Sequence, residues 1–182
     1  MTDASTPDAG SAPEAGPASA VSAEPPRRVI EAAAARGLHI DVQASPRASS
    51  LEEAAALRGI TPADIVKTLV VKGRGEDAYL FALIPGDRSI SWPKLRALVG
   101  VNKLRLPEPH LAREATGYER GTIVPIGSTR DWPVYADERM RGRRVSMGAG
   151  AHGWTLFVDA DDLISAYGAT VADISEPIDA IR

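Results

Sequence analysis

The 182-residue chain contains no cysteine, and this absence excludes several kinds of chemistry. Without a thiol there is no disulfide framework, no thiolate nucleophile, no cysteine-ligated zinc and no iron–sulfur site. The longest apolar runs span about five residues, against the roughly 18 needed to cross a membrane. The N-terminus lacks the basic and apolar regions of a secretory signal. These absences predict a cytoplasmic protein with no membrane span.

Familiar catalytic signatures are also missing. Residues 148–153 match the pattern GxGxxG, but a dinucleotide fingerprint follows an early strand and opens a helix, whereas these glycines precede a β-rich segment. There is no GxSxG elbow and no Walker A loop. The histidines are far apart and lack the spacing of metal ligands; they are His39, His110 and His152. We therefore expect no metal and no cofactor.

The charges are distributed unevenly along the chain. Residues 1–26 carry four acids and no lysine or arginine, and 18 of the 26 are Ala, Pro, Ser or Gly. Such a segment buries too little apolar surface to offset its ordering entropy, so we expect a disordered tail over 1–26 and one domain over 27–182. Residues 86–146 hold 12 basic and 7 acidic side chains. This basic middle is compatible with a polyanion-binding face or with ordinary surface charge.

Helix and strand signals alternate without a regular rhythm. Ser49-x-x-Glu52 has the form of a capping box, and Thr61-Pro62 that of a further helix start. Two β-rich segments around a glycine-containing turn predict a hairpin. The pattern predicts a mixed α/β (α+β) domain rather than a doubly wound one. The expected helices cover 27–36, 49–58, 91–99, 108–115 and 159–167, and the expected strands cover 39–42, 67–72, 78–84, 103–106, 134–136, 145–147, 154–158 and 171–174.

Lys67 stands at the head of an apolar strand face. In a strand over 67–72, Lys67 shares a face with Leu69 and Val71. A lysine in that place is either an end residue whose amine reaches water or a partly desolvated functional amine. The spacing alone favours the first interpretation.

Two glycine-rich loops are further candidates for a site. Residues 117–127 contain three glycines and one proline, and residues 146–152 form a second such turn. Loops of this kind can present backbone N–H groups to an oxyanion or phosphate, or they can simply connect elements. His152 is a candidate base or hydrogen-bond donor, although a plain turn histidine is the simpler interpretation.

The order of these pieces resembles the YbaK/EbsC family of prolyl-tRNA-editing domains. The resemblance covers residues 28–175 and implies a single compact domain with a mixed, barrel-like β-sheet and surrounding helices. It also implies hydrolysis of the ester in a mischarged aminoacyl-tRNA. The matching pieces are Gly59-Ile-Thr-Pro-Ala-Asp-Ile-Val-Lys-Thr-Leu-Val-Val, Ala115-Thr-Gly-Tyr with Gly121 and Pro125-Ile-Gly, Pro133-Val-Tyr-Ala-Asp, Val145-Ser-Met-Gly-Ala-Gly-Ala-His-Gly and Asp162-Leu.

The resemblance assigns roles to individual residues. Lys67 matches the key lysine of the family, which binds the phosphate at the tRNA 3′ end or orients the aminoacyl ester, and this reverses the interpretation from spacing. Gly121 and Pro125 match a loop whose backbone contacts the aminoacyl group and the terminal adenosine. Thr122, Val124 and Thr155 depart from the family pattern, where Gly, Ser and Asp are usual. The catalytic candidates are Lys67 and Gly121, and the substrate-binding candidates are Thr68, Tyr118, Thr122, Pro125, Ser146, Gly148 and His152.

Three functions follow as hypotheses. The first is a trans-acting aminoacyl-tRNA deacylase, with Cys-tRNA(Pro) or another small amino acid on tRNA as substrate. The second is a non-catalytic tRNA- or nucleotide-binding module of the same fold. The third is a regulatory domain that docks a synthetase. The expected partners are the acceptor end of aminoacyl-tRNA and prolyl-tRNA synthetase.

Overall fold

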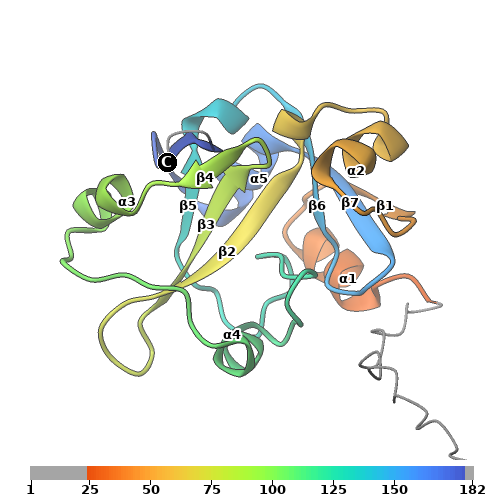
Figure 1. Cartoon of the computed structure of the whole chain (residues 1–182). Helices are drawn as coiled ribbons and strands as arrows, with labels where there is room; N and C mark the ends of the chain where they lie inside the picture. The colour runs from red at the N-terminus through yellow and green to blue at the C-terminus, as the bar shows by residue number, and fades with distance from the viewer. Residues whose placement is uncertain (1–23, 179–182) are drawn as a thin grey trace, which may run out of the picture.

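The computed structural model describes residues 24–178 (Figure 1). The tail expected over 1–26 lies almost wholly outside these residues. None of the helices in the described part is both long and apolar enough to cross a membrane. The helices are α1 (Arg27–Ala35), α2 (Leu51–Arg58), α3 (Trp92–Val99), α4 (Pro109–Thr116) and α5 (Ala160–Tyr167), with 3₁₀ turns η1 (Pro62–Asp64) and η2 (Glu138–Met140).

The strands of the described residues form three sheets. One has the order β1-β7-β6, a second β2-β3-β5-β8 and a third β4-β9. The predicted hairpin is confirmed as the antiparallel pair β2–β3, whereas β3–β5 and β5–β8 are parallel. The strands are β1 (Ile40–Ala44), β2 (Val66–Lys72), β3 (Tyr79–Pro85), β4 (Arg88–Ile90), β5 (Val134–Asp137), β6 (Arg144–Gly148), β7 (Trp154–Asp159), β8 (Thr170–Ala172) and β9 (Ser175–Pro177).

The mixed α/β class is thus confirmed, but within 24–178 the sheets do not close into a barrel. The two larger sheets lie side by side in Figure 1 and meet at a single parallel bridge between Ile65 and Ser146. Beyond this bridge the edge of β2 is open until Lys72, which pairs with Arg105. This open edge is the feature of the fold that creates the site.

The start of α2 differs by one residue from the predicted capping box. Ser50, not Ser49, is the N-cap: its Oγ accepts a hydrogen bond from the N–H of Glu53 at 3.1 Å. The Glu53 carboxylate in turn accepts the N–H of Ser49 at 2.7 Å. The prediction was wrong because two serines are followed by two glutamates, so the motif can be formed by Ser49 with Glu52 or by Ser50 with Glu53. The extended backbone of Ser50 makes Ser50 the N-cap.

Three further expectations are corrected. The helix expected after Thr61 is a single 3₁₀ turn, because Ile65 is already extended and leads into β2. The strand expected over 103–106 is reduced to the bridge at Arg105, next to prolines that lack an N–H. The strand expected over 171–174 is two short strands, β8 and β9. β4 was not predicted, because three residues carry no periodic signal.

The core lies on both faces of the β2–β3 hairpin. Val66 and Val70 of β2 belong to a large cluster with Phe81 and Leu83 of β3. Alternate residues point the other way, so Val71 belongs to a smaller cluster with Leu95 of α3. Leu69 packs against this second cluster. Lys67 lies on that second face, as the alternation predicts.

A network of charges at the end of β5 leads to a prediction for acid stability. Asp173 accepts hydrogen bonds from Lys94 at 2.7 Å and Arg139 at 2.8 Å, and these bonds lower the pKa of Asp173 to about 2. The unfolded value is about 3.9, so the stabilisation is present above that pH and is lost as the pH falls toward 2. We expect urea unfolding to show a fall in stability over this window that is smaller in Asp173→Asn. Equal falls in both proteins would contradict this assignment.

Candidate functional site

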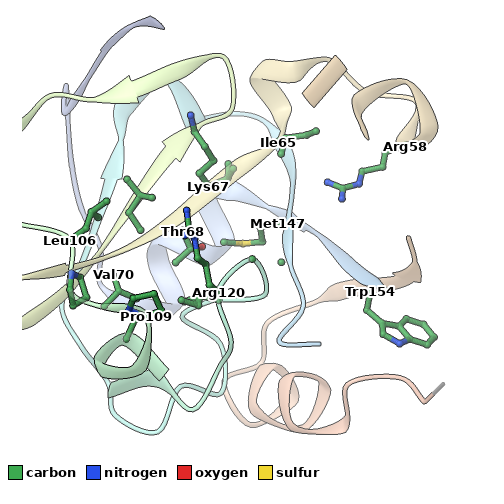
Figure 2. Close-up of a pocket in the computed structure, with 17 residues that line it drawn as sticks. Arg58, Ile65, Lys67, Thr68, Val70, Leu106, Pro109, Arg120, Met147 and Trp154 are labelled. Carbon is green, nitrogen blue, oxygen red and sulfur yellow. The ribbon is translucent and has the colours of Figure 1, made fainter. Parts of the chain in front are cut away.

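A cavity of about 550 Å³ runs along the open edge of β2 (Figure 2). Six consecutive residues, 65–70, contribute to its wall. Because successive side chains of a strand point to opposite faces, such a run means that the backbone edge itself faces the cavity. Lys72 exchanges two backbone hydrogen bonds with Arg105, at 2.8 and 3.0 Å, on the side away from β3. The two-residue period therefore directs the peptide groups of Thr68 and Val70 toward the cavity.

The remaining walls come from five parts of the chain. Leu106 and the residues that follow it form one side, and the loop after α4 forms another. The end of β6, the start of β7 and the end of α2 complete the cavity. Much of the lining is apolar. The members outside the run 65–70 are Arg58, Leu106, Pro107, Pro109, Ala112, Arg120, Gly121, Ile123, Met147, Gly148 and Trp154.

The lining carries positive charge alone. Arg58, Lys67 and Arg120 belong to it, and no aspartate or glutamate of the described range 24–178 does. Burial lowers the pKa of the Arg58 guanidinium, but an arginine remains charged in a protein. Such a cavity favours a ligand that combines negative charge with an apolar or aromatic part.

Lys67 lies at one end of the cavity with its ammonium engaged. Its Nζ donates a hydrogen bond to the carbonyl oxygen of Arg88, the first residue of β4. In Figure 2 the amine points away from Thr68 and Met147. Burial lowers the pKa of Lys67, and the nearby Asp87 carboxylate opposes this shift. The amine is therefore partly desolvated, as the functional interpretation required, but it is directed to the β3–β4 connection.

Four of the predicted site residues lie together in the lining: Lys67, Thr68, Gly121 and Gly148. The Oγ1 atom of Thr68 is buried and has no hydrogen-bond partner. Gly121 has φ +89°, a conformation that other residues rarely adopt. A Cβ added to Gly148 would lie 3.0 Å from the carbonyl of Thr122. Gly148 thus lets β6 approach the loop that contains Gly121.

Three of the predicted site residues, all in the 117–127 loop, lie outside the lining. Tyr118 is buried and donates its hydroxyl to the carbonyl of Ile126 at 2.8 Å, and burial raises the pKa of Tyr118 to about 12. Thr122 is buried and donates its Oγ1 to the carbonyl of Glu119 at 2.8 Å. Pro125 is also buried. These three residues shape the loop from within.

The other two predicted residues also lie outside the lining. Ser146 is fully buried, and its Oγ bonds to Arg58 Nη1 at 3.1 Å and to Thr155 Oγ1 at 2.9 Å. His152 Nε2 lies 3.2 Å from the Glu119 carboxylate, so this pair ties the two glycine-rich loops together at the surface. Neither residue has its side chain in the cavity wall.

Sequence reasoning missed Arg58. It is the last residue of α2, where a basic side chain ordinarily interacts with the helix dipole. One weak signal was available in the sequence. Ala54 and Ala55, which stand one helical turn before Arg58, have no carboxylate, so the arginine has no ion-pair partner on its own helix face. Met147 and Trp154 were missed as lining residues because only the β6–β7 pairing brings them to the cavity.

Comparison with known proteins identifies the chain as an aminoacyl-tRNA editing domain. Residues 45–166 match the family of that description, and the chain belongs to this family. It is 36% identical over 117 residues to a proline–tRNA ligase of Heliobacterium modesticaldum, which is 64% of this chain and 20% of the ligase. It is 34% identical over 86 residues to the ligase of Thermosipho africanus, which is 47% of this chain and 15% of the ligase. The chain thus spans about a fifth of the length of the curated relatives it matches.

Solved structures extend the similarity to nearly the whole domain. A crystal structure of a candidate trans-editing enzyme for prolyl-tRNA synthetase has a TM-score of 0.76 at 32% identity, over 83% of this chain and 96% of that one. A hypothetical protein designated APE2540 has a TM-score of 0.74 at 31% identity, over 82% and 99%. The family and fold implied by the sequence resemblance are thereby confirmed.

Proposed function

We propose that the chain is a trans-acting aminoacyl-tRNA deacylase that hydrolyses the ester of a small amino acid mischarged onto tRNA. Cys-tRNA(Pro) is the first candidate substrate. The observation that carries the proposal is the cavity: three cations and no carboxylate lie beside an apolar wall and an open strand edge. An aminoacylated 3′ end has the matching chemistry, with phosphates, a polar ester and a small side chain. The similarity to part of the proline–tRNA ligases supports tRNA(Pro) as carrier and prolyl-tRNA synthetase as partner.

The proposed chemistry relies on positioning. An aminoacyl ester is already activated, and the neighbouring ribose hydroxyl can assist its hydrolysis. No histidine, aspartate or glutamate belongs to the cavity lining. Backbone N–H groups at the edge of β2 and around Gly121 and Gly148 are suited to hold a water molecule and the developing oxyanion. Such preorganised donors can supply much of the rate enhancement of an acyl transfer.

The walls of the cavity favour small amino acids. Val70, Ala112, Ile123 and Met147 supply apolar surface, and the Thr68 hydroxyl is a buried polar group without a partner. A thiol or hydroxyl of a small substrate side chain can pair with Thr68, whereas a proline ring cannot. One methylene alone changes binding by about 1–3 kcal/mol, so the unpaired hydroxyl supports selection for cysteine or serine.

The proposal is tested with tRNA(Pro) charged separately with cysteine, alanine, serine and proline. We expect the purified chain to remove one of the three small amino acids and to spare proline. Lys67→Ala should lower the rate by at least roughly tenfold, because it removes a charged group at the cavity. Lys72→Ala is the matched control, since Lys72 lies on the same strand outside the lining and donates its Nζ to the carbonyls of Gly75 and Glu76. Retention of every ester would contradict the proposal.

A non-catalytic tRNA-binding module is the second candidate. It is supported by the lack of a histidine or carboxylate among the described lining residues and by the engaged ammonium of Lys67. Its signature is salt-dependent binding of tRNA without loss of any ester. Filter binding over a salt series, with the same four charged tRNAs, separates this function from the first.

A further inference from the structure

The guanidinium of Arg58 lies in the cavity wall without an acidic partner. Its Nη1 donates to Ser146 Oγ at 3.1 Å and its Nη2 to Ser45 Oγ at 3.3 Å. Both acceptors are neutral hydroxyls, and Arg58 forms no ion pair with any residue in the range 24–178. Figure 2 shows the side chain extending from the end of α2 toward the cavity. A half-buried positive charge is therefore left for a ligand to neutralise.

Unpaired polar atoms gather at this same cavity. Within the described range, four buried side-chain atoms lack a hydrogen-bond partner: Arg58 Nε, Thr68 Oγ1, Ser128 Oγ and Tyr167 OH. The first two belong to residues of the cavity lining, and the last two do not. Buried polar groups in folded proteins are nearly always paired. The exceptions at Arg58 and Thr68 place two unpaired polar groups beside this cavity.

We propose that Arg58 binds the phosphate that joins the terminal adenosine of the tRNA to the preceding nucleotide. This assignment rests on the function proposed above. A guanidinium presents its N–H groups in a planar fork that matches two phosphate oxygens. The hydroxyls of Ser45 and Ser146 fix the plane of that fork before the substrate arrives. Little side-chain freedom is then lost on binding.

Arg58 is better placed for this contact than the other two cations of the lining. The resemblance to known editing domains left Lys67 with two roles, the phosphate contact or the orientation of the ester. The ammonium of Lys67 donates to the carbonyl of Arg88, at the β3–β4 connection. Arg120 is exposed on its loop, where water and salt screen its charge. The phosphate contact therefore goes to Arg58, and orientation of the ester remains for Lys67.

The position of Arg58 also fits the path of a strand of nucleotides. A second hollow of about 260 Å³ is lined by Gln43, Arg58, Ile60, Arg144 and Phe157. Among the residues that the structure describes, Arg58 is the one that belongs to both hollows. A phosphate at Arg58 directs the terminal adenosine and its ester into the larger cavity and the preceding nucleotide toward the smaller hollow.

The test compares two esters that differ by one phosphate. The first is adenosine aminoacylated on its ribose with whichever amino acid the tRNA assay identifies, and the second is the same ester with a 5′-phosphate. We expect the parent chain to prefer the phosphorylated ester in kcat/KM, and Arg58→Gln to lower this preference by about tenfold or more. Arg58→Lys keeps the charge without the fork and should lower it less. Arg141→Gln, at an exposed arginine outside both hollows, should leave the preference unchanged.

Several results would overturn the assignment. Equal losses on both esters in Arg58→Gln would show that the residue acts on the structure and not on the phosphate. An unchanged preference in Arg58→Gln would show that another group binds the phosphate. If the parent hydrolyses neither ester nor any charged tRNA, the proposed function fails, and Arg58 is then tested by binding. Calorimetry should still show tighter binding of AMP than of adenosine by the parent, and no such preference would refute the site.

Discussion

Gly148→Val should lower kcat/KM for aminoacyl-tRNA about 100-fold. A Cβ at position 148 would lie 3.0 Å from the carbonyl of Thr122 and 3.2 Å from that of Ile123, which is closer than side chains ordinarily approach. The two γ-methyl groups of valine must push this segment away from β6. Gly121 and Ile123 of the same loop line the cavity, so the displacement alters the groups that would hold the ester. A misplacement of about 1 Å can cost 100-fold in rate.

The effect should be specific to this contact rather than to the loss of a glycine. Gly73→Ala is the matched control, because a Cβ there meets Ala78 Cβ at an ordinary 3.5 Å and Gly73 lies outside the lining. We expect the control to keep the parent rate. Overpacking also costs about 1–3 kcal/mol of stability, so the melting temperature of Gly148→Val is measured beside its rate. A valine variant that melts lower but hydrolyses at the parent rate would show that the loop position is unimportant for catalysis.

The fold could be predicted from local signals wherever one element carried a complete pattern. The β2–β3 hairpin was predicted from two apolar runs around a glycine turn. Three of its four strand ends differ from the prediction by one residue, and the fourth agrees. The errors fell where two patterns competed or a segment was short. The doubled serines before α2 and the three-residue strand β4 are such places. At these places the local sequence favoured no one structure over another, and contacts with the rest of the fold determined which one formed.

The site was harder to predict because its residues are assembled by pairing between distant strands. Lys67, Thr68, Gly121 and Gly148 were recognised through the family resemblance, and they do line one cavity. Tyr118 was grouped with them although it is a buried support, because a loop sequence does not tell which side chains point inward. Arg58 was missed for the opposite reason. That Arg58 has no ion-pair partner within 24–178 can be seen only in the folded structure. In the sequence, its place at the end of a helix was explained by the helix dipole.

Asp137 is expected to be among the most sensitive positions for stability: Asp137→Ala should lower the free energy of unfolding by about 3 kcal/mol. The residue is fully buried at the end of β5. Its carboxylate accepts the N–H of Arg139 at 3.1 Å and that of Ile174 at 3.3 Å, and it also pairs with the Arg139 guanidinium at 3.2 Å. Alanine removes the acceptor of both peptide N–H groups, of which that of Ile174 is buried and that of Arg139 is partly buried. A buried donor left unpaired costs about 1–3 kcal/mol.

Asp159→Ala tests whether burial is the cause. Asp159 caps α5 and also accepts two backbone N–H groups, from Asp161 at 2.9 Å and Asp162 at 3.1 Å, but it is exposed, so water can replace its carboxylate. Loss of such a cap costs about 1 kcal/mol. Urea unfolding gives the loss in free energy of unfolding for Asp137→Ala and for Asp159→Ala relative to the parent. Each variant loses the acceptor of two backbone N–H groups, so the difference between the two losses measures the added cost of burial. Equal losses would mean that the N–H groups of Arg139 and Ile174 find other acceptors, and that the end of β5 is more adaptable than its contacts indicate.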